Sequence, residues 1–346
     1  MKQDNANWAD ISAHWSAPPP SRMTFVDLFC GAGGLSRGLE MAGLRGVCGL
    51  DWFEEAGATY SRNFGHPFVG GDITKPETKA RLYETIERRL GASGSPDLVA
   101  GGFPCQGFSM EGNRVVDDPR NSLYKELVEV VRNLRPKIVV CENVKGLRSM
   151  LRGGVEKKIL EDFKDIGYDV SVATLCAADY GVPQLRERVV FIGNRLGLAN
   201  LHPKPVVPPD GYVTVGAAID DLVDRPADPS FNHEPAVHRP DMVERMAALK
   251  GGESVYPGFK SSWRRLRVDR PAWTIKENHG QSAVHPTLPR VLTAREMARL
   301  QSFPDDFVFE GTKSKTQIQI GNAVPPLLGK AIGLAVRCLC GDLPRK

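Results

Sequence analysis

One stretch of the chain carries a candidate nucleophile. Cys105 directly follows Pro104 in the glycine-rich residues 101–109, just after the apolar run 98–100. A cysteine reacts as its thiolate, which nearby positive charge or a helix N-terminus favours. Proline restricts φ and glycine frees it, so such a loop can hold one residue and still move. Taken alone, the stretch favours a structural cysteine in a tight turn, because free cysteines usually behave as small buried hydrophobes.

A glycine turn near the N-terminus predicts a second site. The β-rich run 24–29 leads into Cys30-Gly31-Ala32-Gly33-Gly34, and a helical pattern from Leu35 to Ala42 follows. A strand, a glycine turn and a helix start present backbone N–H groups to a nucleotide-like ligand. The pattern is shorter than the full dinucleotide fingerprint, so a tight turn without a ligand also explains it.

Acidic residues follow the next two strand candidates. Asp51 ends the run 47–50, about 20 positions past the glycine turn, where an acid can accept hydrogen bonds from ribose hydroxyls. Trp52 beside it either stacks on a purine or packs in the core. The run 68–73 predicts a third short strand with Asp72 near its end. Because strand ends of an open α/β sheet meet at one crevice, the glycine turn and the two acids together predict a ligand site there.

The rest of the first half alternates between the two periodicities. The sequence predicts helices over 75–90, 123–134 and 156–166, and strands over 97–100, 137–141, 170–176 and 188–192. Strands that alternate with helices at this spacing indicate an α/β fold with a doubly wound, mostly parallel sheet.

The composition limits the classes of function. Of 346 residues, 41% are hydrophobic and 25% charged, and the net charge of +4 permits a nucleic-acid partner without requiring one. No apolar run is long enough to span a bilayer, and the N-terminus lacks a signal-peptide pattern. The 7 cysteines include no C-x-x-C pair, and the histidines lack ligand spacing with them. We therefore expect no disulfide framework, no metal site and a reducing cytoplasm.

The chain changes character after about residue 195. Residues 195–271 are rich in proline and poor in periodicity, which predicts a small irregular second domain. Near its end lies a basic cluster around Trp263, which suits phosphate contacts or forms a solvated loop: Lys260, Arg264, Arg265 and Arg267. A helix over 292–303, a glycine-bearing loop over 318–326 and a final apolar helix over 327–339 complete the prediction.

Five motifs occur in an order that is specific to one family. They are Asp27-Leu28-Phe29-Cys30-Gly31-Ala32-Gly33-Gly34, Pro104-Cys105-Gln106, Glu142-Asn143-Val144, Gln184-Leu185-Arg186-Glu187-Arg188 and Gly321-Asn322-Ala323-Val324. The chain resembles the bacterial C5-cytosine-specific DNA methyltransferases of restriction-modification type. The resemblance covers residues 25–339 apart from 195–271.

The resemblance implies a Rossmann-like methyltransferase domain with a smaller target-recognition domain. We expect a loose leader over 1–22, a catalytic domain over 23–194 and a target-recognition domain over 195–290. Residues 291–346 would form a hinge and a C-terminal helix that returns to the catalytic domain.

The resemblance also implies roles for individual residues. Cys105 matches the nucleophile, Glu142 its acid partner, and Arg188 the arginine that holds the pyrimidine, with Arg186 as a companion that could instead bind backbone or phosphate. The positions that match contacts to S-adenosylmethionine are Phe29, Gly31, Gly33, Gly34, Leu35, Asp51, Trp52, Asp72, Ile73, Phe103, Leu123 and Asn322.

These residue types suit methylation of cytosine at C5. A thiolate from Cys105 that adds to C6 turns the ring into an enamine, which splits one difficult step into easier ones. Glu142 would donate a proton or hydrogen bond to N3, and Arg188 would bind the base carbonyl. The less favoured alternative for Glu142 is a strand-end carboxylate that caps a turn, and for either arginine it is a surface ion pair. No side-chain base for the C5 proton is evident, which leaves water or hydroxide.

The partner implied is double-stranded DNA. A cytosine inside a duplex hides C6, so the reaction requires base flipping. Residues 107–121 would close over the base, with Arg114 and Arg120 at phosphates, while the second domain reads the major groove. The resemblance further implies a cytoplasmic, monomeric enzyme, with a cognate restriction endonuclease acting on the same site. The target sequence is not readable from the chain.

Three other functions fit part of the pattern. A tRNA cytosine methyltransferase would use the same machinery, and the small second domain does not exclude it. A catalytically silent DNA-binding protein would not need Cys105, Glu142 and Arg188 together. A nicotinamide dehydrogenase is disfavoured by the short glycine pattern and the Pro104-Cys105 loop.

Overall fold

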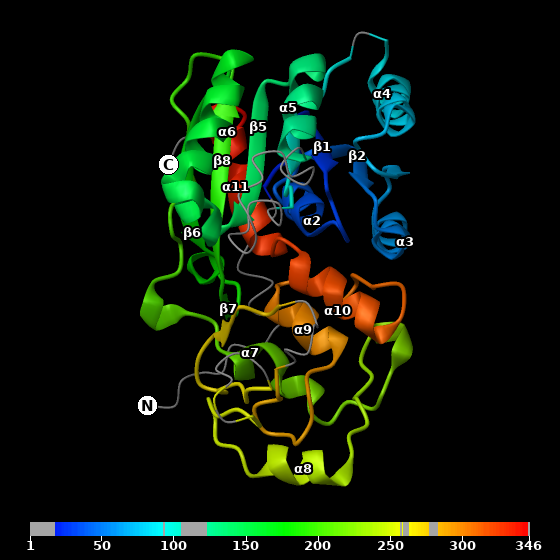
Figure 1. Ribbon diagram of the computed structural model, residues 1–346, viewed down its shortest axis with the longest axis vertical. Helices are drawn as coiled ribbons and strands as arrows, with labels where there is room; N and C mark the ends of the chain where they lie inside the picture. Colours follow the sequence, from blue (N-terminus) through cyan, green and yellow to red (C-terminus); the bar gives the residue numbers. More distant parts are fainter. Residues whose placement is uncertain are drawn as a thin grey trace. The chain divides into compact units, whose positions relative to one another are not determined.

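A computed structural model describes residues 18–92, 94–104, 123–256, 258, 263–276 and 283–344 (Figure 1). The chain divides into two compact units. We call residues 18–175, 187–204 and 328 onward the sheet unit, and residues 176–186 and 205–327 the second unit. No helix among the described residues is long and apolar enough to cross a membrane.

The sheet unit is built on a seven-stranded sheet in the order β3-β2-β1-β4-β5-β8-β6. The strands are β1 (Thr24–Leu28), β2 (Arg45–Asp51), β3 (Phe68–Gly70), β4 (Leu98–Gly101), β5 (Ile138–Val144), β6 (Asp169–Cys176) and β8 (Glu187–Asn194). The pairs β1–β2, β1–β4, β2–β3 and β4–β5 are parallel, and β5–β8 is antiparallel. The predicted α/β fold with a doubly wound, mostly parallel sheet is confirmed.

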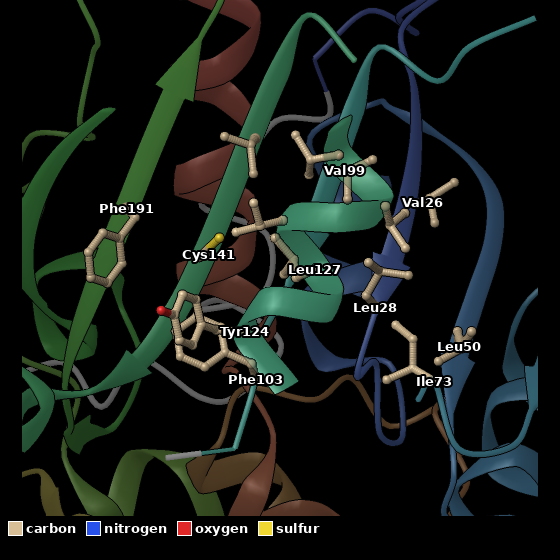
Figure 2. Packing of buried hydrophobic residues seen from close by; sticks show 14 of the residues in the cluster. Val26, Leu28, Leu50, Ile73, Val99, Phe103, Tyr124, Leu127, Cys141 and Phe191 are labelled. Atoms are coloured by element: carbon tan, nitrogen blue, oxygen red, sulfur yellow. The ribbon is translucent and has the colours of Figure 1, made fainter. Parts of the chain in front are cut away.

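Helices cover both faces of this sheet. They are α2 (Gly34–Met41), α3 (Glu54–Asn63), α4 (Pro76–Leu90), α5 (Leu123–Leu134), α6 (Gly154–Asp165) and α11 (Pro326–Leu339). In Figure 1, α5 and α6 lie in front of the sheet and α11 behind it, and Figure 2 shows the same order for α5, β5 and α11. Gly329 of α11 meets the backbone of α2 at Gly38. The sheet is therefore buried on both sides, as parallel sheets usually are.

Alternation of side chains along β1 separates the two faces of the sheet. Val26 and Leu28 of β1 join a buried apolar cluster with Leu127 of α5 and Phe191 of β8 (Figure 2). Asp27 between them is buried on the side of α2, where Ser36 donates a hydrogen bond to it. A strand inverts its side chains at each residue, so one polar residue in an apolar run lies opposite the main cluster.

The second unit is irregular and has short elements. They are β7 (Gln184–Leu185), α7 (Val215–Ile219), α8 (Pro240–Ala247), β9 (Ala272–Trp273), α9 (Ala294–Leu300) and α10 (Lys313–Asn322), with β7 and β9 paired in parallel. Thr293 and Glu296 form a capping box at the start of α9, which lies within the helix predicted over 292–303.

Two expectations about local structure are wrong. The predicted loop over 318–326 is largely helix α10, which continues to Asn322. Its buried face includes Gln317 and Gln319 rather than an apolar stripe, so it has no readable hydrophobic period. The third strand ends at Gly70, which leaves Asp72 in the turn that follows.

Some elements were absent from the prediction. Helix α3 has a polar sequence with few apolar anchors, among them the buried Ala56 and Tyr60. Helices α7 and α8 lie in the segment that was expected to be irregular. At the other end, Ser21 lies inside the predicted leader, yet it is buried and its N–H donates to the Gly43 carbonyl.

Candidate active site

The ends of β1 and β4 lie beside β5 at the centre of the sheet. Leu28, the last residue of β1, pairs with Gly101 of β4, and Gly101 pairs with Cys141 of β5. A Cβ added to Gly101 would lie 2.7 Å from the Leu28 carbonyl oxygen, so only glycine fits this approach. The chain reverses its direction of travel across the sheet between β1 and β4. Ligands of such folds bind at the carboxyl ends of the strands at this switch point.

The glycine turn leaves the first of these ends. Phe29, Gly31 and Gly33 all have positive φ, of 58°, 51° and 93°. A Cβ at Gly33 would lie 2.3 Å from a ring carbon of Phe64, whereas a Cβ at Gly31 would meet nothing within 4 Å. Gly33 thus packs tightly beneath the turn, while Gly31 faces open space, as a backbone that approaches a ligand must. Gly34 and Leu35 begin α2 and are buried.

Asp51 is the last residue of β2, and its side chain holds the glycine turn by hydrogen bonds. Its Oδ2 accepts the Gly31 N–H at 2.8 Å and its Oδ1 accepts the Phe53 N–H at 3.0 Å. Burial raises the pKa of Asp51, and the backbone donors oppose that rise. Trp52 is 71% exposed, which excludes the core-packing interpretation. The indole is available to a flat ligand next to the turn.

The remaining predicted cofactor positions lie in different surroundings. Asp72 is exposed and its Oδ1 accepts the N–H and hydroxyl of Thr74. Ile73 and Phe103 are buried in the main cluster, and Leu123 packs against it. Asn322 is the last residue of α10, in the second unit, and is exposed.

Glu142 and Arg188 form the ionic centre of the site. They come from the antiparallel strands β5 and β8, and Arg188 Nε lies 2.9 Å from Glu142 Oε1. Their side chains are only 11% and 12% exposed. A Cβ at Gly102 would lie 3.2 Å from Glu142 Oε2, so this second oxygen faces the chain as it leaves β4. The carboxyl group is therefore oriented by one arginine toward the backbone that leads to Cys105.

Asn143 positions the same backbone, a role that the motif alone did not reveal. Its Nδ2 donates to the Phe103 carbonyl at 2.9 Å and its Oδ1 accepts the Val144 N–H at 2.8 Å. The side chain is buried. The two residues are 40 positions apart, so the spacing of the motifs contains no signal for this contact. Asn143 ties the tip of β5 to the peptide just before Pro104.

Arg186 is buried in the second unit, where its guanidinium binds backbone carbonyls. It is 1% exposed. Its Nη1 donates to the Ile275 carbonyl at 2.9 Å, and its Nη2 to the carbonyls of Gly321 and Ala323 at 2.9 and 3.0 Å. Among the roles considered for Arg186, the structure shows the backbone-binding one, and burial excludes the surface ion pair.

The predicted DNA contacts differ in accessibility. Arg265 is 4% exposed and donates to the carbonyls of His285, Leu288 and Met246, so its guanidinium is used inside the second unit. Arg264 stacks over Trp273, 4.5 Å from the ring centroid. Arg267 is exposed beside Asp269. Cys105, Arg114, Arg120 and Lys260 lie outside the described residues.

The other cysteines are free thiols, and three of them are buried. Cys30, Cys48 and Cys141 are buried, while Cys176, Cys338 and Cys340 are partly exposed. Burial raises the pKa of the Cys48 thiol to about 12, so it stays protonated and unreactive near neutral pH. Within the described residues, no three histidine, cysteine or acidic side chains are grouped to hold a metal ion.

Known proteins share both the sequence and the fold. The model of the C-5 cytosine-specific DNA methylase family matches residues 23–338. The chain is 40% identical over 330 residues to the Type II methyltransferase M1.HphI of Haemophilus parahaemolyticus, which covers 91% of this chain and 86% of that protein. It is 35% identical over 369 residues to the Type II methyltransferase M.DdeI of Desulfomicrobium norvegicum, with 90% and 87% covered.

Solved structures agree with these matches. An E. coli protein encoded within a prophage, described as a DNA modification methyltransferase, superposes with a TM-score of 0.74 at 28% identity and covers 92% of this chain and 99% of its own. A DNMT2 protein of Spodoptera frugiperda superposes with a TM-score of 0.64 at 16% identity, with 91% and 99% covered. The second likeness shows the fold alone.

Proposed function

The chain belongs to the C-5 cytosine-specific DNA methylase family, and we propose that it transfers the methyl group of S-adenosylmethionine to C5 of a cytosine rotated out of a specific duplex DNA sequence. The observation that carries this proposal is the register Leu28, Gly101, Cys141 across the sheet. The glycine turn and the Cys105 loop therefore leave the sheet at adjacent strands, and Glu142 follows Cys141 in the strand next to them.

The residues of the turn fit the methyl donor. Gly31 offers backbone with open space in front of it, Asp51 is an acid at the next strand end, and Trp52 is an exposed indole beside it. These groups suit a main-chain contact, hydrogen bonds from ribose hydroxyls and stacking on a purine. Bound there, S-adenosylmethionine supplies an electrophilic methyl group on a sulfonium sulfur.

The reaction at the base is assigned to three side chains. The Cys105 thiolate forms a bond to C6, and the electron pair of the C5–C6 double bond is displaced into the ring. Glu142 donates a proton or hydrogen bond at N3 to neutralise that charge, and Arg188 orients Glu142 and binds the base carbonyl. After methylation C5 loses its proton to water or hydroxide, and the electron pair that returns to C5–C6 expels the Cys105 thiolate.

The target base is reached by flipping. Cytosine C6 is inaccessible within the stack, so the nucleotide must leave the duplex at a cost of a few kcal/mol. We assign sequence reading to the second unit, with Arg264 and Arg267 as exposed or half-exposed cations for phosphate contacts. The relatives' Type II names support a cognate endonuclease that cuts the same site when it is unmethylated.

Transfer of a labelled methyl group tests the proposal. The parent should label duplex DNA, Cys105→Ser should lose turnover while it retains donor binding, and Cys338→Ser should behave as the parent because that thiol lies in helix α11.

A duplex with 5-fluorocytosine at the target should trap the parent covalently and leave Cys105→Ser free. Bisulfite sequencing of a plasmid from expressing cells identifies the target. Label that enters tRNA but not duplex DNA, or turnover by Cys105→Ser near the parent rate, would contradict the proposal.

A further inference from the structure

A chain of hydrogen bonds runs through the core beneath the glycine turn. Asp27 Oδ2 lies 2.7 Å from Ser36 Oγ, which lies 2.8 Å from the Tyr60 hydroxyl. That hydroxyl lies 2.7 Å from His66 Nε2. On the far side of the imidazole, Nδ1 lies 3.3 Å from Glu40 Oε1. Five side chains from β1, α2, α3 and the segment before β3 thus form one continuous path.

The path is sealed at one end and open at the other. Asp27, Ser36, Tyr60 and His66 are 1%, 0%, 0% and 4% exposed. The Glu40 side chain is 29% exposed, so solvent reaches the outer end only. Inside, Asp27 Oδ1 is buried without a hydrogen-bond partner among the described residues. Burial of a carboxylate oxygen without a donor raises the free energy of the ionised form. Asp27 can therefore lose or gain a proton at a small cost in free energy.

The inner end lies where the proposed methyl donor would bind. Asp27 belongs to β1 and Ser36 to the first turn of α2, so their hydrogen bond closes the turn 29–33 from below. This step rests on the proposed function, which assigns that turn to the donor. The donor carries a positive sulfonium centre and the demethylated product does not, so a charge on Asp27 distinguishes the two.

The donor and acceptor roles along the path can be satisfied in two ways. With Asp27 ionised, Ser36 donates to Asp27, Tyr60 donates to Ser36, and His66 donates from Nε2 to Tyr60. If one proton enters from solvent at the Glu40 end and each proton of the path moves one place, Asp27 becomes a neutral donor and His66 carries its proton on Nδ1, toward Glu40. The path therefore gains one proton from solvent when Asp27 is neutralised, and it returns that proton when Asp27 is ionised.

We propose that Ser36, Tyr60 and His66 are positioning residues that form a proton-conducting path, through which the solvent-exposed Glu40 end sets the charge on Asp27 and with it the preference of the site for donor over product. The groups that face this path are the Asp51 carboxylate and the Cys30 and Cys48 thiols, with Arg89 near Cys48.

The electrostatics of the surroundings are consistent with such a switch. Burial, opposed by the Ser36 hydrogen bond and increased by the Asp51 charge, raises the pKa of Asp27 to about 7. Burial raises the pKa of Cys30 and of Tyr60 well above their usual values, so these groups stay protonated across the neutral range. Asp27 therefore changes charge in the pH range where its thiol and phenol neighbours do not.

The test compares affinities for S-adenosylmethionine and S-adenosylhomocysteine by calorimetry, without DNA, between about pH 6 and 9. In the parent, the affinity for S-adenosylmethionine divided by that for S-adenosylhomocysteine should rise by about tenfold as pH rises through about 7. A tenfold change lies in the middle of the usual range of coupling between two sites. Asp27→Asn should abolish this rise. Tyr60→Phe keeps the ring and removes one hydroxyl, and should shift the midpoint upward by about one pH unit, because Asp27 loses a polarised donor chain.

Infrared spectroscopy gives an independent readout of the same proton. The infrared band of the protonated Asp27 carboxyl group is identified as the carbonyl band that is missing from Asp27→Asn. This band should titrate at a higher pH in Tyr60→Phe than in the parent. His66→Gln, which keeps an N–H donor without a titratable ring, should also shift it. Tyr168→Phe is the matched control, since it removes another buried tyrosine hydroxyl, bonded to the Pro136 carbonyl, from the same unit.

The outcomes separate this inference from the proposed function. If neither ligand binds at any pH, the proposed donor site is wrong. If both bind but the affinity ratio is flat with pH, or Tyr60→Phe and Tyr168→Phe shift the Asp27 band equally, the path is overturned while the donor site stands.

Discussion

At the scale of single residues, Glu142 and Arg188 make an ion pair with little access to water. The side chains are 11% and 12% exposed and the joined atoms are 2.9 Å apart. Such a pair contributes little net stability compared with apolar residues, yet removal of one partner leaves a buried charge. Its use here is orientation, because it leaves Glu142 Oε2 directed at Gly102.

Removal of the arginine should therefore destabilise the protein more than removal of both charges. We expect Arg188→Met to lower the free energy of unfolding by about 3 kcal/mol, because a carboxylate remains buried. The double variant Glu142→Gln/Arg188→Met should recover most of that loss. Urea unfolding measures both. Equal stabilities for the single and double variants would mean that the pair is not buried in solution.

Asp27 makes stability depend on pH in the opposite sense to an ordinary paired carboxylate. Its pKa is raised from 3.8 to about 7, so between these values the folded chain retains a proton that the unfolded chain releases. The free energy of unfolding from this group falls as pH rises through that window and levels off above it. From about pH 4 to pH 8, Asp27→Asn should gain on the order of 4 kcal/mol relative to the parent. Parallel pH profiles of the two proteins in urea unfolding would contradict this.

At the scale of elements, the glycine turn joins β1 to α2 through backbone that only glycine adopts easily. Gly33 combines φ of 93° with a Phe64 ring carbon 2.3 Å from its would-be Cβ, whereas Gly31 has φ of 51° and open space. A side chain at Gly33 would cause both backbone strain and a clash, whereas a side chain at Gly31 would cause backbone strain alone.

These two positions give a matched pair of variants. Gly31→Ala should lower the free energy of unfolding by about 1 kcal/mol, from backbone strain, and should weaken donor binding. Gly33→Ala should lower it by about 3 kcal/mol or more, because the new methyl group displaces the Phe64 ring. Thermal unfolding and donor calorimetry measure the two effects. A larger loss of stability for Gly31→Ala would refute this account of the turn.

Asn143 links two elements across 40 residues of sequence. Asn143→Ala should release the Phe103 carbonyl and loosen the peptide before Pro104, at a cost of about 1 to 2 kcal/mol for the buried partners left behind. We expect kcat to fall by at least tenfold with donor affinity nearly unchanged, since the turn at Gly31 is not involved. A steady-state analysis beside donor calorimetry separates the two, and an equal loss in both would show that the side chain supports the whole sheet edge.

Elements with an apolar period were predicted well, and those without one were not. Helix α5 has buried residues such as Leu127 and Val131 at helical spacing, and its bounds match the expectation. Helix α10 buries glutamines and threonine, and α3 is polar along most of its length. Tertiary partners stabilise these two helices, so no local pattern announces them.

At the scale of the whole molecule, DNA binding should depend on a few cations rather than on net charge, which is only +4. Of the predicted cluster, Arg265 is committed to three carbonyls inside the second unit, while Arg267 is exposed beside Asp269. An arginine that contacts a phosphate contributes to the salt dependence of binding, and one that is used internally does not.

Arg267→Ala should weaken duplex binding uniformly across sequences and reduce the slope of log K against log salt by about 1. Arg239→Ala is the matched control, because Arg239 is also exposed beside an aspartate two residues on, with a pair distance of 3.0 Å against 3.2 Å for Arg267. Fluorescence anisotropy over a salt series measures both slopes. Identical slopes for the two variants would remove Arg267 from the proposed DNA contacts.

The sequence by itself determined the family, the α/β order and the residues at strand ends, because these depend on short motifs and local periodicity. The tertiary structure decided which of them act together. It paired Leu28 with Gly101 and Gly101 with Cys141, enclosed Arg265, and joined Asn143 to Phe103 and, through Ser36, Asp27 to Tyr60. Such contacts depend on sheet register and burial, which arise between residues far apart in the chain and leave no periodic trace in it.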